Sequence, residues 1–148
     1  MRVLVVEDGL EYTKSFEQFI GAPFEFVRAG SGREALQALA TGSFDLLFLD
    51  MRFDRATELL GDLDALVDRH NGELARARRF LEDNQGAYVL AAIRDAGHRQ
   101  PALMSYDFDG EPRRFENLRA RYGPLAYLTD TAGPQETRAA LLALTSAG

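Results

Sequence analysis

Residues 44–50 have the sequence Phe44-Asp45-Leu46-Leu47-Phe48-Leu49-Asp50, a short apolar run that ends in an acidic side chain. A second run of this kind, Val3-Leu4-Val5-Val6, is followed directly by Glu7 and Asp8. Continuous apolar runs of this length are typical of strands that are buried on both faces, as the strands of parallel sheets are. The two runs therefore predict an α/β fold with a parallel sheet.

Helical and strand patterns alternate along the rest of the chain. Ser31 and Glu34 have the spacing of a capping box, so a helix is expected to begin there. Together the patterns predict strands at residues 3–6, 24–27, 44–49, 102–104 and 125–128, and helices at 10–20, from 31, at 88–96, at 113–121 and from about 134. Five strands that alternate with helices predict a five-stranded doubly wound parallel sheet.

Three carboxylates lie at the carboxyl ends of two of these strands. Glu7 and Asp8 follow the strand at residues 3–6, and Asp50 follows the strand at residues 44–49. The carboxyl ends of adjacent parallel strands meet at one edge of the sheet, where open α/β folds bind ligands. Clustered carboxylates repel one another unless a hard divalent cation lies among them, and Mg²⁺ is the usual one. The pattern predicts a phosphoryl site with Mg²⁺, in which one carboxylate acts as nucleophile. The alternative is that Glu7 and Asp8 only stabilise the amino terminus of the first helix.

The connection that follows Asp50 is much longer than the usual βα connection of about 2–6 residues. Apolar residues recur at helical spacing on both sides of Asn71-Gly72, which is a turn signal. The pattern predicts a helical hairpin, or alternatively one long helix, inserted at about residues 54–85. Its expected role is that of a lid over the site or of a partner-docking element, and the alternative is simple packing on the sheet.

Length and composition restrict the class of protein. The chain has 148 residues, a net charge of −6 and no cysteine. This length predicts a single domain, residues 1–148, and the negative charge argues against nucleic acid or an anionic membrane as a partner. No apolar run approaches the roughly 20 residues that are needed to cross a bilayer. With no signal-peptide pattern before the first strand, we expect a cytoplasmic protein.

Four segments outside the expected insertion have a specific order and spacing. They are Val3-Leu4-Val5-Val6-Glu7-Asp8, residues 44–52 with Asp50 near their end, residues 86–94 (Gly-Ala-Tyr-Val-Leu-Ala-Ala-Ile-Arg), and residues 126–130 with Tyr127. Through these segments the chain resembles the receiver domain of two-component response regulators. The resemblance implies a flavodoxin-like receiver fold with a helical insertion after the third strand.

The resemblance also implies a role for each acidic residue. Asp50 would be the phospho-acceptor. Glu7, Asp8, an oxygen of Asp50 and the main-chain carbonyl of Arg52 would hold Mg²⁺, which offsets negative charge during phosphoryl transfer. A histidine kinase or phosphotransfer protein would supply the phosphoryl group, and a downstream protein, or a second copy in a homodimer, would bind the face that contains Tyr127, the switch aromatic.

One departure from the family's pattern concerns the lysine that normally follows the fifth strand. Asp130 stands in that position, and the only lysine of the chain is Lys14, on the first helix. A fourth carboxylate would favour a cation but oppose an incoming phosphate, and it would raise the pKa of a neighbouring acid. Arg52 is the nearest arginine in sequence, although a planar guanidinium does not reproduce an ammonium group.

A second departure concerns the hydroxyl that normally ends the fourth strand. Ser105 is the candidate for this switch position, but counting from Pro101 places Tyr106 there instead. A serine would keep the hydrogen-bond donor for the phosphoryl group, whereas a tyrosine would be too large.

The sequence is therefore consistent with three functions. The first is an atypical stand-alone receiver in a phosphorelay, which is no enzyme beyond the phosphorylation and dephosphorylation of its own Asp50. The second is a degenerate receiver that binds proteins without phosphorylation. The third is a phosphatase of the haloacid-dehalogenase type, which would need an aspartate in the position of Arg52 and a nearby lysine.

Overall fold

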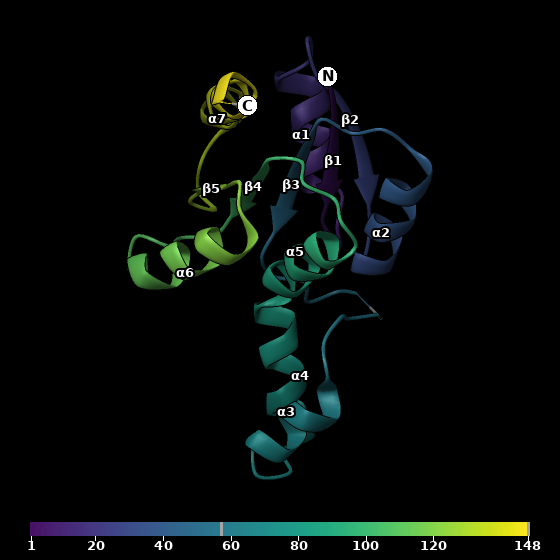
Figure 1. Cartoon of the computed structure of the whole chain (residues 1–148), viewed down its shortest axis with the longest axis vertical. Helices are drawn as coiled ribbons and strands as arrows, with labels where there is room; N and C mark the ends of the chain where they lie inside the picture. Colours follow the sequence, from purple (N-terminus) through teal and green to yellow (C-terminus); the bar gives the residue numbers. More distant parts are fainter. Residues whose placement is uncertain (57, 148) are drawn as a thin grey trace.

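The computed structural model describes residues 1–56 and 58–147. Its five strands form one parallel sheet in the order β2-β1-β3-β4-β5, which confirms the predicted doubly wound architecture (Figure 1). The strands are β1 (Arg2–Val6), β2 (Glu25–Ala29), β3 (Leu46–Asp50), β4 (Ala102–Ser105) and β5 (Leu125–Leu128). The helices are α1 (Glu11–Phe19), α2 (Gly32–Thr41), α3 (Leu63–Arg69), α4 (Leu74–Asp83), α5 (Gln85–Asp95), α6 (Pro112–Tyr122) and α7 (Pro134–Ala147).

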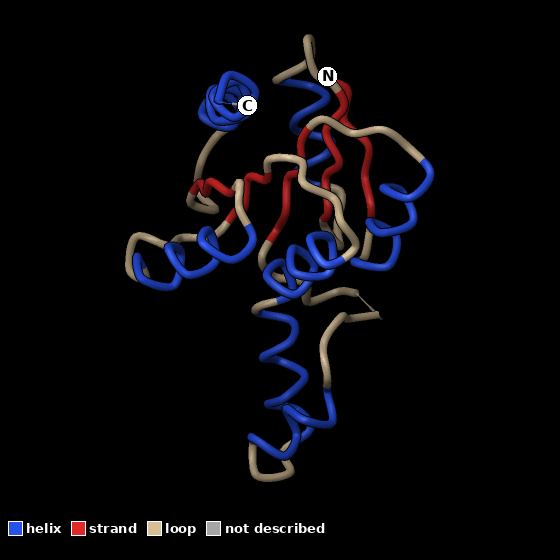
Figure 2. Tube along the Cα trace, viewed as in Figure 1, coloured by secondary structure: helices blue, strands red, loops and turns tan. Residues whose placement is uncertain are grey.

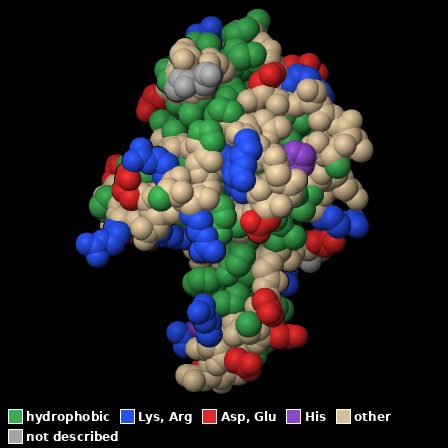
Figure 3. Space-filling model, viewed as in Figure 1, with side chains coloured by type: hydrophobic (Ala, Val, Ile, Leu, Met, Phe, Trp, Pro, Cys, Tyr) green, Lys and Arg blue, Asp and Glu red, His purple; other side chains and the backbone are tan. Residues whose placement is uncertain are grey.

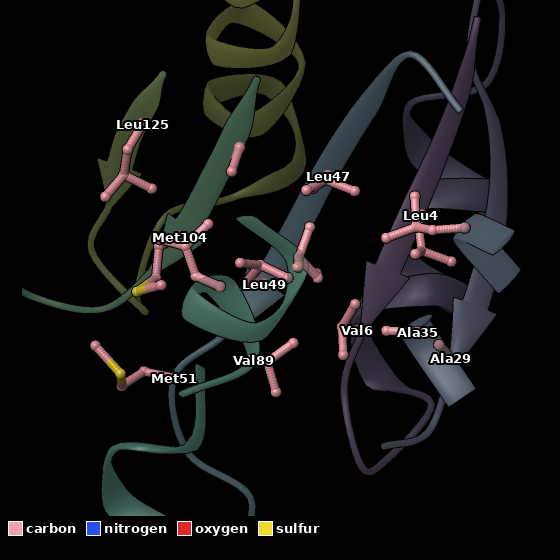
Figure 4. Close-up of a cluster of buried hydrophobic side chains, with 14 of the residues drawn as sticks. Leu4, Val6, Ala29, Ala35, Leu47, Leu49, Met51, Val89, Met104 and Leu125 are labelled. Carbon is pink, nitrogen blue, oxygen red and sulfur yellow. The ribbon is translucent and has the colours of Figure 1, made fainter. Parts of the chain in front are cut away.

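Helices cover both faces of the sheet because each central strand is apolar on both sides. On one face, Val3, Val5 and Phe48 pack with side chains of α1 and α7. On the other face, Leu4, Leu47 and Leu49 pack with side chains of α2 and α5 (Figure 4). All the apolar residues of β1 and β3 are buried, which explains why these two runs show no alternation of apolar and polar residues.

Several element boundaries differ from those expected. β3 extends to Asp50, and β2 runs from residue 25 to residue 29 rather than from 24 to 27. Ser31 caps α2 as predicted, because its hydroxyl accepts the Glu34 amide at 3.2 Å. The reciprocal bond differs, since the Glu34 carboxylate accepts the amide of Gly30 at 2.6 Å and not that of Ser31.

The segment between β3 and α5 contains the predicted helical hairpin. Its helices α3 and α4 pack through a small apolar cluster that includes Leu66, Ala77 and Leu81. Asn71 and Gly72 form the turn with φ angles of 56° and 81°, a left-handed conformation that these two residue types tolerate best. The hairpin projects away from the sheet and does not lie over it (Figure 2).

α5 begins at Gln85, three residues earlier than expected, because it follows α4 almost without a break. Asn84 is both the C-cap residue of α4 and the N-cap residue of α5. The carboxamide of Gln85 is buried and bonds both the amide (2.7 Å) and the carbonyl (3.0 Å) of Leu60. The hairpin is thereby attached to the sheet through the start of α5.

Within the described ranges, the structure contains no helix that is both long enough and apolar enough to cross a membrane.

Candidate functional site

Asp50 is the last residue of β3, at the centre of the sheet. Ser105 of β4 lies opposite it in the strand register. The Asp50 carboxylate accepts a weak bond from the amide of Arg52, at 3.4 Å. Burial, and then the negative charges of Asp8 and Glu7, raise the pKa of Asp50 to about 7, although nearby amides act in the opposite direction. The surroundings of Asp50 therefore favour its protonated form more than water does.

Glu7 is buried at the amino terminus of α1. Its carboxylate accepts the amide of Tyr12 at 3.1 Å, and the amide and hydroxyl of Thr13 at 2.7 and 2.6 Å. The N-cap residue, Leu10, has no side chain that could accept these bonds. Glu7 therefore satisfies free amides at the start of α1, where a negative charge is also favoured by the helix dipole.

Asp8 is bound by an arginine from the loop after β3. Its Oδ2 accepts the Arg55 amide at 2.7 Å, and its Oδ1 lies 4.0 Å from the Arg55 guanidinium. The same guanidinium donates two bonds to Glu11, at 2.9 and 3.1 Å. These bonds lower the pKa of Glu11 to about 2. Arg55 therefore places one positive charge between two carboxylates.

Gly9 allows this arrangement because the arginine passes directly over it. A Cβ atom on Gly9 would lie 2.4 Å from the guanidinium of Arg55 and 2.1 Å from the carboxylate of Glu11. From the other side, the guanidinium of Arg28 donates to the carbonyl oxygens of Asp8 (2.9 Å) and Gly9 (2.5 Å). The loop after β1 is thus held by two arginines.

Ser105 is the hydroxyl that lies beside Asp50. Its Oγ is 2.8 Å from the hydroxyl of Tyr12, and burial raises the pKa of that tyrosine. The hydroxyl of Tyr106 instead donates to the carboxylate of Glu111. Ser105, and not Tyr106, lies opposite Asp50 in the strand register, and its role as the switch hydroxyl stays a prediction.

Tyr127 and Asp130 lie at the far side of the site. The hydroxyl of Tyr127 donates to Asp109 at 2.7 Å, while its ring packs on Phe108 and Phe115. Asp130 is exposed in the turn after β5. Its charge contributes to the raised pKa of Tyr12, whereas the charges that raise the pKa of Asp50 are those of Asp8 and Glu7.

Sequence analysis did not identify Arg55 or Arg28 as site residues. Only Arg52 was considered as a substitute cation, because it is nearest in sequence. Arg28 had a usable signal: it is the fourth residue of β2 and lies opposite Val5 in the register, close to the acidic end of β1. Arg55 had no such signal, since it lies in an irregular loop.

The chemistry of the carboxylates suits Mg²⁺, but their arrangement does not. In the part of the chain that is described, no three acidic or histidine side chains are arranged to hold one metal ion. Glu7 accepts three bonds from α1, and Asp8 accepts from Arg55. Because Arg55 provides a positive charge beside Asp8, the site as observed does not fit the predicted set of metal ligands. The metal roles of Glu7, Asp8, Asp50 and the Arg52 carbonyl stay predictions.

The position of Asp50 depends on a close approach between α5 and β3 at Gly86. A Cβ atom on Gly86 would lie 2.5 Å from the carbonyl oxygen of Asp50 and 2.8 Å from the Cα of Met51. We expect Gly86→Ala to lower the free energy of unfolding by about 2 kcal/mol, because the backbone must move apart. Gly110, which has open space around it, provides the matched control. Equal urea midpoints for Gly86→Ala and Gly110→Ala would contradict this expectation.

Comparison with known proteins identifies the fold. No protein-family profile and no curated protein sequence matches the chain. Solved structures do match, among them a response regulator receiver domain from Francisella, with 17% identity, a TM-score of 0.67, and coverage of 98% of this chain and 96% of that one. A chemotaxis response regulator of Vibrio cholerae has 17% identity, a TM-score of 0.65, and coverage of 97% and 98%.

A third similar structure was solved with ligands. It is a response regulator of Thermotoga maritima in complex with Mg²⁺ and BeF, with 18% identity, a TM-score of 0.61, and coverage of 97% of this chain and 98% of that one. The five-stranded sheet, its strand order and these likenesses agree with one another. The chain has the fold of a response-regulator receiver domain.

Proposed function

We propose that the chain is a receiver module of phosphorelay signalling that accepts a phosphoryl group on Asp50. The observation that carries this proposal is the environment of Asp50: a poorly paired carboxylate at the end of the central strand, with a hydroxyl opposite it on β4. Open α/β sheets bind their ligands at this edge. A histidine kinase or phosphotransfer protein would be the donor, and a downstream protein would bind the phosphorylated form.

The proposed chemistry is a direct displacement at phosphorus. An ionised Oδ of Asp50 forms the new P–O bond, the bond from phosphorus to the donor breaks, and the leaving group keeps the electron pair. The raised pKa of Asp50 makes its carboxylate more basic than an ordinary one. The Ser105 hydroxyl, once it turns away from Tyr12, would donate to a phosphoryl oxygen.

A cation at this site has to compete with Arg55. Mg²⁺ would require an oxygen of Asp8, and both oxygens of Asp8 lie near Arg55. We therefore propose that Mg²⁺ binds only when the loop after β3, which contains Arg55, moves away from Asp8. No step of the reaction is assigned to Mg²⁺.

A second candidate function is protein binding without phosphorylation. The ion pair of Arg55 with Asp8 and the presence of Asp130 in place of the usual lysine both favour it. In contrast, no observation favours a phosphatase. Such an enzyme would need an aspartate at the second position after Asp50, where this chain has Arg52, and the next candidate, Asp54, is exposed beside Arg55.

The test is phosphorylation by a small phosphodonor, acetyl phosphate, in the presence of Mg²⁺, followed by intact-protein mass spectrometry. We expect one phosphoryl group on the wild type and none on Asp50→Asn. Asp95→Asn is the control, because Asp95 is exposed at the end of α5, and it should be modified like the wild type. Absence of the adduct from all three proteins would favour the second candidate, provided that an amide NMR titration with beryllium fluoride also gives no shifts at Asp50.

A further inference from the structure

A surface groove lies between α5 and α6, away from the acidic residues. One part, of about 190 Å³, is lined by Ala87, Tyr88 and Ala91 of α5 together with Leu118 and Tyr122 of α6. Leu118 and Tyr122 also line a second hollow of about 400 Å³. The wider hollow is lined by residues of α6 alone. The two hollows therefore adjoin at Leu118 and Tyr122, and together they are called the groove, with these two side chains as its apolar floor.

The apolar floor is half-buried, since Leu118 and Tyr122 are neither fully buried nor fully exposed. None of the eleven residues of this fully described helix is completely buried, although Phe115, Leu118 and Tyr122 pack on the main core. The helix is nevertheless fixed. Near its start, Arg114 donates to Asn84, and at its end the buried Arg94 donates to the carbonyl of Tyr122 at 2.8 Å. The groove is thus preformed.

The rim of the groove is basic. α6 contains four arginines and one glutamate, in a chain whose net charge is −6. Arg114 and Arg119 form ion pairs with Glu111 and Glu116. As far as the structure describes the chain, Arg113 and Arg121 form no salt bridge, and both line the wider hollow. Figure 3 shows basic side chains gathered over and around α6.

We propose that this groove binds an acidic amphipathic helical segment of a partner protein. Its apolar side chains would occupy the floor at Leu118 and Tyr122, and its carboxylates would pair with Arg113 and Arg121. An amphipathic helix in an apolar groove is a common mode of recognition, and charge complementarity selects the acidic partner over others. The proposal goes beyond the proposed function, because the groove is separate from Asp50 and requires no phosphorylation.

The groove is also distinct from the surface expected to respond to Asp50. Tyr127 does not line either hollow; it packs on Phe108 and Phe115 and bonds Asp109. Tyr88 instead connects the groove to the hairpin, because it packs against the hairpin's own cluster. A segment bound in the groove would therefore contact α5, α6 and the base of the hairpin.

The test uses three synthetic peptides as probes: a helical peptide with leucines at positions i, i+3, i+4 and i+7 and glutamates on the other face, the same peptide with lysines for glutamates, and a scrambled acidic peptide. Binding is followed by amide NMR shifts of the unmodified protein. We expect the acidic amphipathic peptide alone to bind, with the largest shifts at Ala91, Leu118 and Tyr122.

Two pairs of charge reversals separate this site from general electrostatics. Arg113→Glu with Arg121→Glu should weaken binding at least tenfold. Arg33→Glu with Arg99→Glu, which makes the same change of net charge on exposed residues elsewhere, should change it less than twofold. Equal effects of the two pairs, equal binding of the lysine peptide, or shifts confined to another surface would each overturn the proposal.

A second copy of the chain is the competing occupant. Sedimentation of the wild type should show a monomer at the concentrations of the titration. A dimer that is dissociated by Arg113→Glu with Arg121→Glu would overturn the assignment to a partner protein.

Discussion

At pH 8, the Asp50→Asn variant is expected to be more stable than the wild type by as much as about 4 kcal/mol. Burial beside Asp8 and Glu7 raises the pKa of Asp50 from 3.8 to about 7 in the folded protein, and one pKa unit corresponds to about 1.4 kcal/mol. Between about pH 4 and pH 7 the folded state therefore holds a proton that the unfolded chain has released, and at pH 8 it carries a partly buried charge instead. The asparagine side chain resembles the protonated acid and has no charge to bury.

The sign of the pH dependence follows from linkage. A carboxyl group whose pKa is higher in the folded state stabilises the protein below pH 4, and this stabilisation is lost as the pH rises from about 4 to about 7. The difference between Asp50→Asn and the wild type should thus be small at pH 4 and largest above pH 7. Urea unfolding between pH 4 and 8, with a chelator present, measures it.

The control for this experiment is Asp95→Asn, which changes an exposed carboxyl group and should leave the difference near zero at every pH. A difference for Asp50→Asn that does not vary with pH would mean that the carboxyl group titrates normally.

The second large effect is expected from Arg55→Gln, which should increase the affinity for Mg²⁺ about tenfold. The substitution removes the guanidinium that lies 4.0 Å from Asp8, while the main-chain amide can still donate to that carboxylate. Repulsion between an exposed guanidinium and a divalent cation at this range is on the order of 1–2 kcal/mol. Isothermal titration calorimetry with MgCl₂ measures the change.

Two further measurements test the cause of this effect. Arg119→Gln removes an arginine that pairs with Glu116 on α6, outside the site, and it should leave Mg²⁺ affinity unchanged. The pKa of Glu11, followed by carboxyl NMR, should return upward in Arg55→Gln because its two bonds from Arg55 are lost. Unchanged Mg²⁺ affinity together with a restored Glu11 would show that Arg55 does not compete with the cation.

Much of the fold could be predicted because its signals are local. The apolar runs of β1 and β3 are unbroken since both faces of these strands are covered, and Asn71-Gly72 marks a turn that needs left-handed backbone. The strand order then follows from few alternatives, because crossovers in parallel sheets are short and have one hand. The resemblance to receiver domains then gave the expected roles of Asp50 and Ser105.

The contacts within the site could not be predicted in the same way. Arg55 reaches Asp8 and Glu11 across a long separation in sequence, through a loop whose path no periodic pattern determines. The bonds of Glu7 to α1 arise because Leu10 leaves the first amides of that helix without a side-chain cap. Such contacts depend on loop geometry in three dimensions, and residue types alone do not contain it.

The short junction at Asn84 has a thermodynamic consequence. α4 ends at Asp83 and α5 begins at Gln85, and the amide of Gly86 donates to the carbonyl of Met51, the neighbour of Asp50, at 2.9 Å. Where a ligand of the hairpin shifts this junction and so changes the burial of Asp50, it also changes the proton affinity of Asp50. By reciprocity, Asp50 protonation changes the affinity of that ligand by the same factor, so the complex takes up or releases protons as it forms.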